Sequence, residues 1–424
     1  MKLEYLKLTN FRGFREFEIS FDPFFTVILG GNMAGKTAVL DGAASGLSMF
    51  FWARGPMKPI EDEEIRKIIT EIGGVPDLQQ QFPVTVEARV ATRSPERKLV
   101  TWKLLRGETT SQTIPDSPLD GALAAFAPGS SPTDLPLFAK YGTHRAWRGM
   151  PNTQQPRGAG SRHDGYVGWF DITSTHQLLA TWIHKQTLVQ LQRGDGYVQP
   201  QLAAVEAAVK SCIDGVTRFW FDVQYDELRL ERTTGDIQSF AMLSEGVRNM
   251  VAMVADIAWR AAVLNPQHGT EANLLTEGVV LIDELDLHLH PSWQRRIVND
   301  LRRTFPRIQF IVTTHSPQIV ASVSRSQIRL LDHNRLVAEE PYVEGRDSNE
   351  ILEDVFGVPS RPQEVEDEIK ALYRLIEDED FAGARKQLAV LEERLGPDDA
   401  AMIRARWILD TEEVQSPSGP STPA

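Results

Sequence analysis

Cysteine is almost missing from this chain, and long apolar runs are missing altogether. Cys212 is the single cysteine in 424 residues, which excludes an internal disulfide and a cysteine-based zinc cluster. Apolar runs such as FFTVIL at 24–29 are far shorter than the roughly 18 residues of a membrane-spanning helix. The opening MKLEYLKLTNFRGF alternates charged and apolar residues and lacks a signal-peptide pattern. We therefore expect a protein of the reducing cytoplasm without a membrane partner.

Charge is distributed unevenly along the chain. There are 45 Lys and Arg against 58 Asp and Glu, a formal net charge of −13 at pH 7. Residues 339–380 alone hold 15 acidic and four basic residues, a local net charge of −11. The acidity therefore argues against nucleic-acid contact only in this segment, which is either a solvated helix face or a surface for a basic partner. Two Arg-rich stretches, 144–163 and 291–307, are either solvated surface or a track for a phosphate backbone.

The hydrophobic pattern predicts an α/β core. Runs at 278–283 (GVVLID) and 309–314 (QFIVTT) are typical of strands buried on both faces of a sheet. A helix predicted at 291–304 joins them, and this β–α–β rhythm indicates parallel strands. Further strands are expected at 3–8, 24–29, 83–91 and 98–105, with a pair over 218–233. Further helices are expected at 36–52, 174–192, 199–214, 244–264, 378–395 and 399–410.

Residues 30–37 (GGNMAGKT) fit the phosphate-loop pattern G-x-x-x-x-G-K-[ST], between a predicted strand and a predicted helix. Glycines let the backbone curl so that N–H groups and the helix N-terminus point at phosphate oxygens. In this pattern Lys36 reaches the β- and γ-phosphates, and the Thr37 hydroxyl binds Mg²⁺. A Gly-rich turn without a ligand is the alternative. The predicted nucleotide-binding residues here are Gly30, Asn32, Met33, Ala34, Gly35, Lys36, Thr37 and Ala38.

Two carboxylates follow the buried strand at 278–283. Asp283 ends that strand, where it can hold Mg²⁺ directly or through water. Glu284 comes next and is placed to orient or deprotonate an attacking water. Strands commonly end in acidic residues, so this signal gains its weight from the phosphate loop beside it.

Two further motifs complete the set. His315, in FIVTTHSP (310–317), ends the next strand, where a neutral imidazole can contact a γ-phosphate. LSEGVRN (243–249) opens a predicted helix, and its Ser244 and Gly246 offer a hydroxyl and N–H groups to an anion. The simpler interpretations are a loop histidine and an ordinary N-cap serine.

In this order and spacing the four motifs resemble the RecF/SMC branch of ABC-type ATPases, and LTNFRGF resembles the opening strand of that branch. The resemblance covers residues 1–317. It implies an α/β ATPase head with a mixed and parallel sheet, an antiparallel β subdomain and a helical lobe. It also implies a head-to-tail dimer, or a higher homo-oligomer, that encloses ATP and Mg²⁺ between facing subunits.

The resemblance assigns a role to each motif residue. Thr37 and Asp283 bind the metal of MgATP, Glu284 is the catalytic carboxylate and His315 is the switch histidine. Ser244 and Gly246 act on the nucleotide of the opposite subunit, and Asp286 matches the loop that communicates across the dimer. Weak candidates for the Gln loop are Gln79, Gln80 and Gln81.

Asp286 also opens a D-x-H-x-H pattern with His288 and His290. Such a pattern could serve as a metal site if the segment were extended, because alternate side chains would then share one side. The dimer-loop interpretation explains the segment better.

The chain from about 240 to 410 resembles more narrowly the stand-alone ATPases that pair with HNH endonucleases in Septu-type and retron phage-defence systems. No sustained heptads separate the phosphate loop from LSEGVRN, which disfavours a long coiled coil. After Pro317 no second buried α/β pattern follows, so we do not expect the chain to cut DNA itself. The alternatives are a RecF-like DNA-repair ATPase that binds DNA directly in its ATP dimer, and a nucleotide-binding protein without turnover.

These patterns divide the chain into five expected segments. The domains are an ATPase lobe with the phosphate loop and β subdomain (1–150), a helical signature lobe (151–265), the continued ATPase core (266–340), an acidic helical segment for partner docking (341–412) and a disordered tail (413–424).

Overall fold

The computed structural model divides the chain into two compact units, Met1–Ile351 and Leu352–Ala424. The predicted subdivision of the first unit remains a prediction. The Arg-rich stretch between 144 and 160 and the last nine residues of the predicted tail lie outside the described residues. The structure describes residues 1–51, 55, 57–92, 98–109, 114–115, 134–143, 161–170, 175–194 and 196–415.

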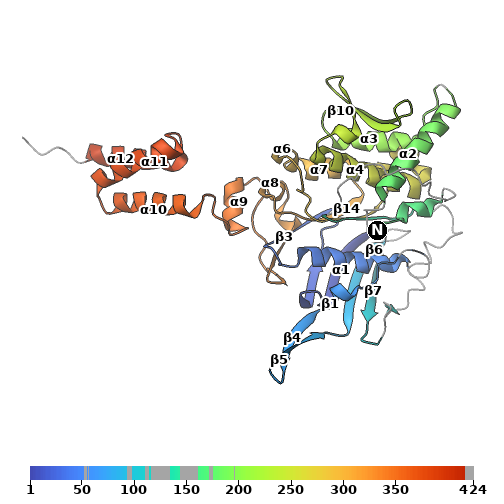
Figure 1. The fold of residues 1–424 in the computed structure, drawn as a ribbon, viewed down its shortest axis with the longest axis horizontal. Coiled ribbons are helices and arrows are strands. Elements are labelled where there is room, and N and C mark those ends of the chain that lie inside the picture. Colours follow the sequence, from blue (N-terminus) through green and yellow to red (C-terminus); the bar gives the residue numbers. More distant parts are fainter. Residues whose placement is uncertain are drawn as a thin grey trace, which may run out of the picture. The chain divides into compact units, whose positions relative to one another are not determined.

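A six-stranded sheet forms the centre of the first unit (Figure 1). Neighbouring strands of this sheet are parallel, except that β15 and β16 are antiparallel. Every residue of β3, β13 and β14 is buried, as predicted for strands covered on both faces. In spatial order the strands are β16 (Arg335–Leu336), β15 (Ile328–Asp332), β3 (Phe25–Gly30), β14 (Ile308–Thr313), β13 (Gly278–Ile282) and β9 (Leu137–Tyr141).

A second, antiparallel sheet forms the predicted β subdomain. Its strand β2 was not predicted, although Phe14, Phe17 and Ile19 of FREFEIS are buried. A separate hairpin, β4 (Lys67–Ile72) with β5 (Val75–Gln80), contains two of the Gln-loop candidates. In spatial order the strands of the second sheet are β2 (Phe14–Ser20), β1 (Lys2–Phe11), β6 (Val84–Thr92), β7 (Lys98–Arg106) and β8 (Ile114–Pro115).

Helix α1 (Lys36–Ser48) packs against strands of both sheets, which explains why its sequence is apolar on more than one face. Two glycines allow the close approach to the second sheet. A Cβ on Gly42 would lie 2.6 Å from the Leu8 side chain, and one on Gly46 would lie 2.9 Å from that of Ala88. The helix that carries Lys36 and Thr37 is thereby fixed between two sheets.

The helical lobe is the upper part of the first unit in Figure 1. Its helices pack on one another and on a three-stranded sheet in the order β10-β11-β12. The lobe contains α2 (Thr175–Gln192), α3 (Pro200–Cys212), α4 (Glu245–Leu264), β10 (Val216–Asp222), β11 (Glu227–Arg232) and β12 (Ile237–Ser239).

The helix predicted at 291–304 is instead two helices, α6 (Pro291–Gln294) and α7 (Ile297–Thr304). At the break the Arg296 N–H bonds Trp293 O at 3.1 Å, one residue short of an α-helical bond. Its guanidinium pairs with Asp214 at 2.6 Å and Asp300 at 2.7 Å. The remaining short helices of the unit are α5 (Ala272–Leu275), α8 (Pro317–Val320) and α9 (Ser348–Asp354), whose last residues fall in the second unit.

The second unit has its own apolar core, built by α10 (Gln363–Glu377), α11 (Phe381–Leu395) and α12 (Ala400–Gln415). Helix α12 continues past the helix end predicted at 410.

In the part of the chain that the structure describes, no helix has both the length and the apolar character that crossing a membrane requires.

Candidate active site

The phosphate loop connects β3 to α1, as the sequence predicts. Gly30 (φ 151°), Met33 (φ 65°) and Gly35 (φ 94°) take left-handed conformations that bend the loop back on itself. Gly35 is also the N-cap residue of α1, and a Cβ there would lie 2.6 Å from the Phe14 ring. The loop thus presents backbone N–H groups together with a helix N-terminus, which is an arrangement that binds phosphate.

Lys36 is only 8% exposed, and its ammonium lies inside the loop. Nζ donates to Gly30 O at 2.8 Å and to Gly31 O at 2.9 Å. Burial lowers the pKa of Lys36, while the charges of three nearby carboxylates oppose that shift. Those carboxylates are the sequence-predicted Asp283, Glu284 and Asp286.

The strand order β3-β14-β13 brings the loop and the acidic residues to one edge of the sheet. Parallel strands have their carboxyl ends on the same side, so residues that follow them meet there. The Thr37 hydroxyl donates to Asp283 Oδ2 at 2.9 Å, although the two residues are 246 positions apart. Asp283 is 5% exposed, and its N–H donates to Tyr141 O of β9 at 2.8 Å.

Thr313, the last residue of β14, organises both acidic residues. Its hydroxyl donates to Asp283 Oδ1 at 2.6 Å and accepts the N–H of Glu284 at 2.7 Å. Glu284 has a φ of 50°, a left-handed conformation that is uncommon outside glycine. The turn at Glu284 leaves the extended path of β13 while its carboxylate remains within electrostatic reach of Lys36.

Asp286 ties the segment after β13 to the segment after β14. Its Oδ1 accepts the Thr314 hydroxyl at 2.5 Å and the His315 N–H at 3.2 Å. His315 is thereby placed beside the acidic segment, at the end of the strand where the sequence predicts it.

The D-x-H-x-H pattern does not bring its three side chains to a common point. The His290 ring bonds the Ser292 hydroxyl at 2.8 Å, and His288 lies 3.7 Å from Glu245. His288 has a φ of 61°, so the segment is a turn and alternate side chains do not share one side. The residues of this pattern have separate partners, Asp286 among them.

The start of α4 packs on this same segment. A Cβ on Gly246 would lie 2.0 Å from His288 O, so only glycine allows the helix to approach this closely. Ser244 is the N-cap residue of α4, but its side chain makes no capping hydrogen bond and is exposed. The structure therefore joins LSEGVRN to the 285–290 segment of the same chain.

Sequence reasoning missed two contributors to the site. Thr313 lies within the quoted FIVTTHSP, and its position at a strand end was the available signal. The second contributor is Asp41 of α1, which no sequence motif marks. It is buried and pairs with Arg12 at 2.6 Å and with Lys140. These ion pairs fix α1 to β9 and to the turn that follows β1.

Other candidate residues have structural partners. Gln79 donates to Asp77 within the β4–β5 hairpin at 3.0 Å. Arg162, from the described end of the first Arg-rich stretch, donates to Leu264 O at 2.7 Å. In the second stretch, Arg303 pairs with Asp300 at 2.8 Å.

Two family models and several known proteins are similar to parts of this chain. A family model described as "AAA domain, putative AbiEii toxin, Type IV TA system" matches residues 116–321, and a model described as "AAA ATPase domain" matches residues 1–42. The SMC head domain from Thermotoga maritima aligns with a TM-score of 0.45 and 14% identity, over 80% of this chain and all of that one.

Two relatives are named as retron ATPases. The "Retron Ec83 probable ATPase" of Escherichia coli is 37% identical over 220 residues, which are 48% of this chain and 38% of the relative. The "Retron Vc95 probable ATPase" of Vibrio cholerae serotype O1 biovar El Tor is 43% identical over 116 residues, 25% of this chain and 22% of the relative.

A third relative, the "Septu protein PtuA" of Bacillus thuringiensis, is 41% identical over 90 residues, 19% of this chain and 23% of the relative. The chain thus spans less than two fifths of the length of each of these curated relatives. The chain is thus similar to AAA ATPase domains over residues 1–42 and 116–321, and to retron and Septu ATPases over shorter stretches.

Proposed function

We propose that this ATPase hydrolyses MgATP in a head-to-tail dimer and controls an HNH-type nuclease partner in anti-phage defence. The observation that carries the proposal is the contact between the Thr37 hydroxyl and the Asp283 carboxylate, beside Glu284. The names of the retron and Septu relatives support the defence role.

The loop and the acidic strand fit MgATP chemically. Phosphate oxygens would accept the backbone N–H groups of residues 30–37, and Lys36 would exchange its two carbonyl partners for phosphate. Thr37 and Asp283 offer hard oxygen donors, the type that Mg²⁺ prefers. When bound there, Mg²⁺ neutralises charge that develops on the transferred phosphoryl group.

Glu284 is the proposed general base. The left-handed turn and the hydrogen bond from its N–H to Thr313 hold its backbone at the edge where the phosphate loop opens. A carboxylate at this position can orient and deprotonate a water aimed at the γ-phosphate. His315, held through its N–H by Asp286, is the proposed sensor of that phosphate.

The proposed dimer uses the exposed start of α4. Ser244 and Gly246 would contact the nucleotide of the opposite subunit, and the exposed hydroxyl of Ser244 supports this role because it does not cap its own helix. Met33 at the tip of the phosphate loop is 94% exposed, as expected for a residue that another subunit covers. Asp286 would couple the two sites, since its segment contacts both His315 and the start of α4.

The proposed nuclease partner binds the acidic helical segment 341–412. Its composition favours a basic protein surface, and DNA would be engaged through the complex. The compartment would be the cytoplasm.

Co-expression with an HNH nuclease encoded beside this gene tests the proposal. We expect the two proteins to co-elute and to degrade DNA in a manner that depends on ATP. Separate elution, or DNA degradation unaffected by ATP and by Glu284→Gln, contradicts the proposal. An ATP-dependent gel shift by this chain alone, with no effect on a nuclease, would favour the RecF-like alternative.

A further inference from the structure

Strand β10 is an edge of the small sheet in the helical lobe. Among the described residues it pairs on one side only, with β11. The pairing shifts between Val216 and Arg218 and is regular from Arg218 to Asp222. About half of the backbone N–H and C=O groups of this regular stretch therefore point away from the sheet, ready to pair with another strand.

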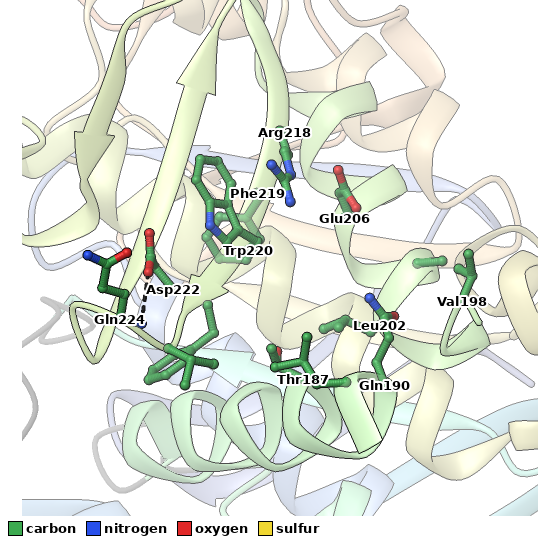
Figure 2. A pocket seen from close by; sticks show the side chains of 14 residues that line it. Thr187, Gln190, Val198, Leu202, Glu206, Arg218, Phe219, Trp220, Asp222 and Gln224 are labelled. Atoms are coloured by element: carbon green, nitrogen blue, oxygen red, sulfur yellow. Dashed lines mark hydrogen bonds between the residues drawn. The ribbon is translucent and has the colours of Figure 1, made fainter. Parts of the chain in front are cut away.

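An open groove of about 450 Å³ runs along this edge (Figure 2). Consecutive residues 218–224 line one wall. Because side chains alternate between the two faces of a strand, a groove lined by consecutive residues follows the edge of the strand. The opposite wall comes from helices, with Leu191 of α2 and Leu202 and Glu206 of α3.

The two faces of β10 differ in character. Phe219 and Phe221 are 4% and 3% exposed and are turned toward the core of the lobe. Arg218 and Trp220 lie on the other face, with the guanidinium 4.4 Å from the centre of the Trp220 ring. Stacking on the indole holds the guanidinium in place while its N–H edge can still bind a carboxylate.

We propose that this groove binds an extended peptide segment of a partner protein, which adds to β10 as a further strand. Its apolar side chains, at alternate positions, would face α2 and α3, and an acidic side chain would lie beside Arg218. This mode obtains affinity from main-chain hydrogen bonds and specificity from alternate side chains. The proposal does not depend on ATP hydrolysis or on a nuclease.

Both walls support this occupant. The helical wall is apolar at Leu191, which is 61% exposed, and at Val198, which is 59% exposed. Glu206 on the same wall would repel an acid that entered on that side, so an acidic residue is accepted only on the Arg218 side. A helical ligand would leave the edge groups of β10 unpaired, which disfavours it.

A displayed library of ten-residue peptides with random sequence tests the proposal on the full chain. We expect enriched peptides that alternate apolar and polar residues, with an acid on the polar face. Methylating the backbone nitrogens of one alternating set of residues should abolish binding, and methylating the other set should not. Enrichment no greater than in a selection without the protein would overturn the proposal.

Paired variants on the same elements sharpen the result. Leu191→Glu and Arg218→Glu should weaken the selected peptides at least tenfold. Leu188→Glu on α2 and Lys210→Glu on α3, both outside the groove lining, should not. Replacing the acid of the peptide by lysine should restore binding to Arg218→Glu.

Two results would show a different occupant or site. Equal affinity for all four variants places the peptides elsewhere on the chain and refutes the groove. A dimer of the protein without peptide that Leu191→Glu dissociates makes a second copy the occupant.

Discussion

At the scale of single residues, Thr313 shows how one hydroxyl can hold a whole site together. It is fully buried and bonds both Asp283 and the N–H of Glu284. Valine has nearly the same shape but can make neither bond, so both hydrogen bonds would be lost.

We therefore expect Thr313→Val to slow ATP hydrolysis and to raise the Mg²⁺ concentration needed for half-maximal rate. The unfolding free energy should fall by about 1–3 kcal/mol, the usual net contribution of two hydrogen bonds. Phosphate release against Mg²⁺ and urea unfolding measure the two effects. Thr217→Val, at an exposed position of β10, is the matched control. If Thr313→Val hydrolyses ATP with the same Mg²⁺ dependence as the wild type, the role of Thr313 is refuted.

Glu284 should be required for chemistry and dispensable for binding. Glu284→Gln removes the base but keeps the shape, and general-base catalysis typically contributes 10²–10⁴-fold. We expect hydrolysis to fall by about that factor while ATP still binds and the dimer accumulates. Phosphate release and mass photometry measure both. The same change at exposed Glu271 should have no effect, and wild-type rates in Glu284→Gln would exclude Glu284 as the base.

Lys36 should take up a proton when ATP binds at alkaline pH. Burial lowers its pKa below the ordinary 10.5 in the free protein, and the phosphates favour the charged form and raise the pKa again. Between the two pKa values binding is coupled to proton uptake, and below both values it is not. Calorimetry in buffers of different ionisation enthalpy measures the uptake. Lys36→Arg, which stays charged, should abolish it, and uptake that persists would contradict this origin.

The same shift gives a sign for stability. With the folded-state pKa of Lys36 below its unfolded value, the unfolded chain binds more protons in the interval between them. Stability contributed by this residue therefore rises with pH across that interval.

At the scale of elements, the approach of α4 to the 285–290 segment depends on Gly246. Any side chain there meets His288 O, a backbone atom that cannot swing aside. The glycine of LSEGVRN is thus also required for α4 to pack against the 285–290 turn.

We expect Gly246→Ala to displace the start of α4 and to weaken the ATP-dependent dimer. Overpacking of this kind typically costs 1–3 kcal/mol, about a tenfold to hundredfold loss in dimer affinity if the displacement is felt at the interface. Equilibrium binding of a fluorescent ATP analogue measures nucleotide binding, and sedimentation with ATP measures dimer formation. Gly142→Ala, where a Cβ meets no atom within 4 Å, is the control. If Gly246→Ala forms the ATP-dependent dimer as the wild type does, the prediction is wrong.

The element pattern shows how far sequence reasoning reaches. Continuous apolar runs correctly located β13 and β14, because burial on both faces makes most positions of a strand apolar. Strand β9 was missed, since its five residues lie beside a stretch rich in Gly, Pro and Ser. The break between α6 and α7 was also missed, because Arg296 at the break pairs with the distant Asp214, which local pattern does not reveal.

At the scale of the whole molecule, most of the acidic segment and the candidate ATP site belong to different units. The residues of the candidate site lie in Met1–Ile351, and ten of the 15 acidic residues of 339–380 lie in Leu352–Ala424. The second unit has a core of its own, which includes Leu372, Leu388 and Met402.

We expect a fragment of residues 352–415 to fold alone, because its core is built from its own three helices. Domains near 60 residues are only marginally stable, so the unfolding free energy should be small, but the transition should be cooperative. Circular dichroism during urea unfolding measures this. Leu388→Asp should abolish the helical signal and Val390→Asp, at a 58% exposed site, should not; a fragment without helix would contradict independent folding.

The sequence by itself determined the motifs, their strands and the class of chemistry, because phosphate binding and strand burial depend on local residue types and spacing. Only the tertiary structure decided that Thr37 meets Asp283 across 246 positions, that Thr313 supports both acids, and that His288 and His290 part from Asp286. Such contacts depend on strand order and on turn conformation, which local pattern leaves undefined. The edge of β10 with its groove likewise exists only once the sheet and the helices have packed.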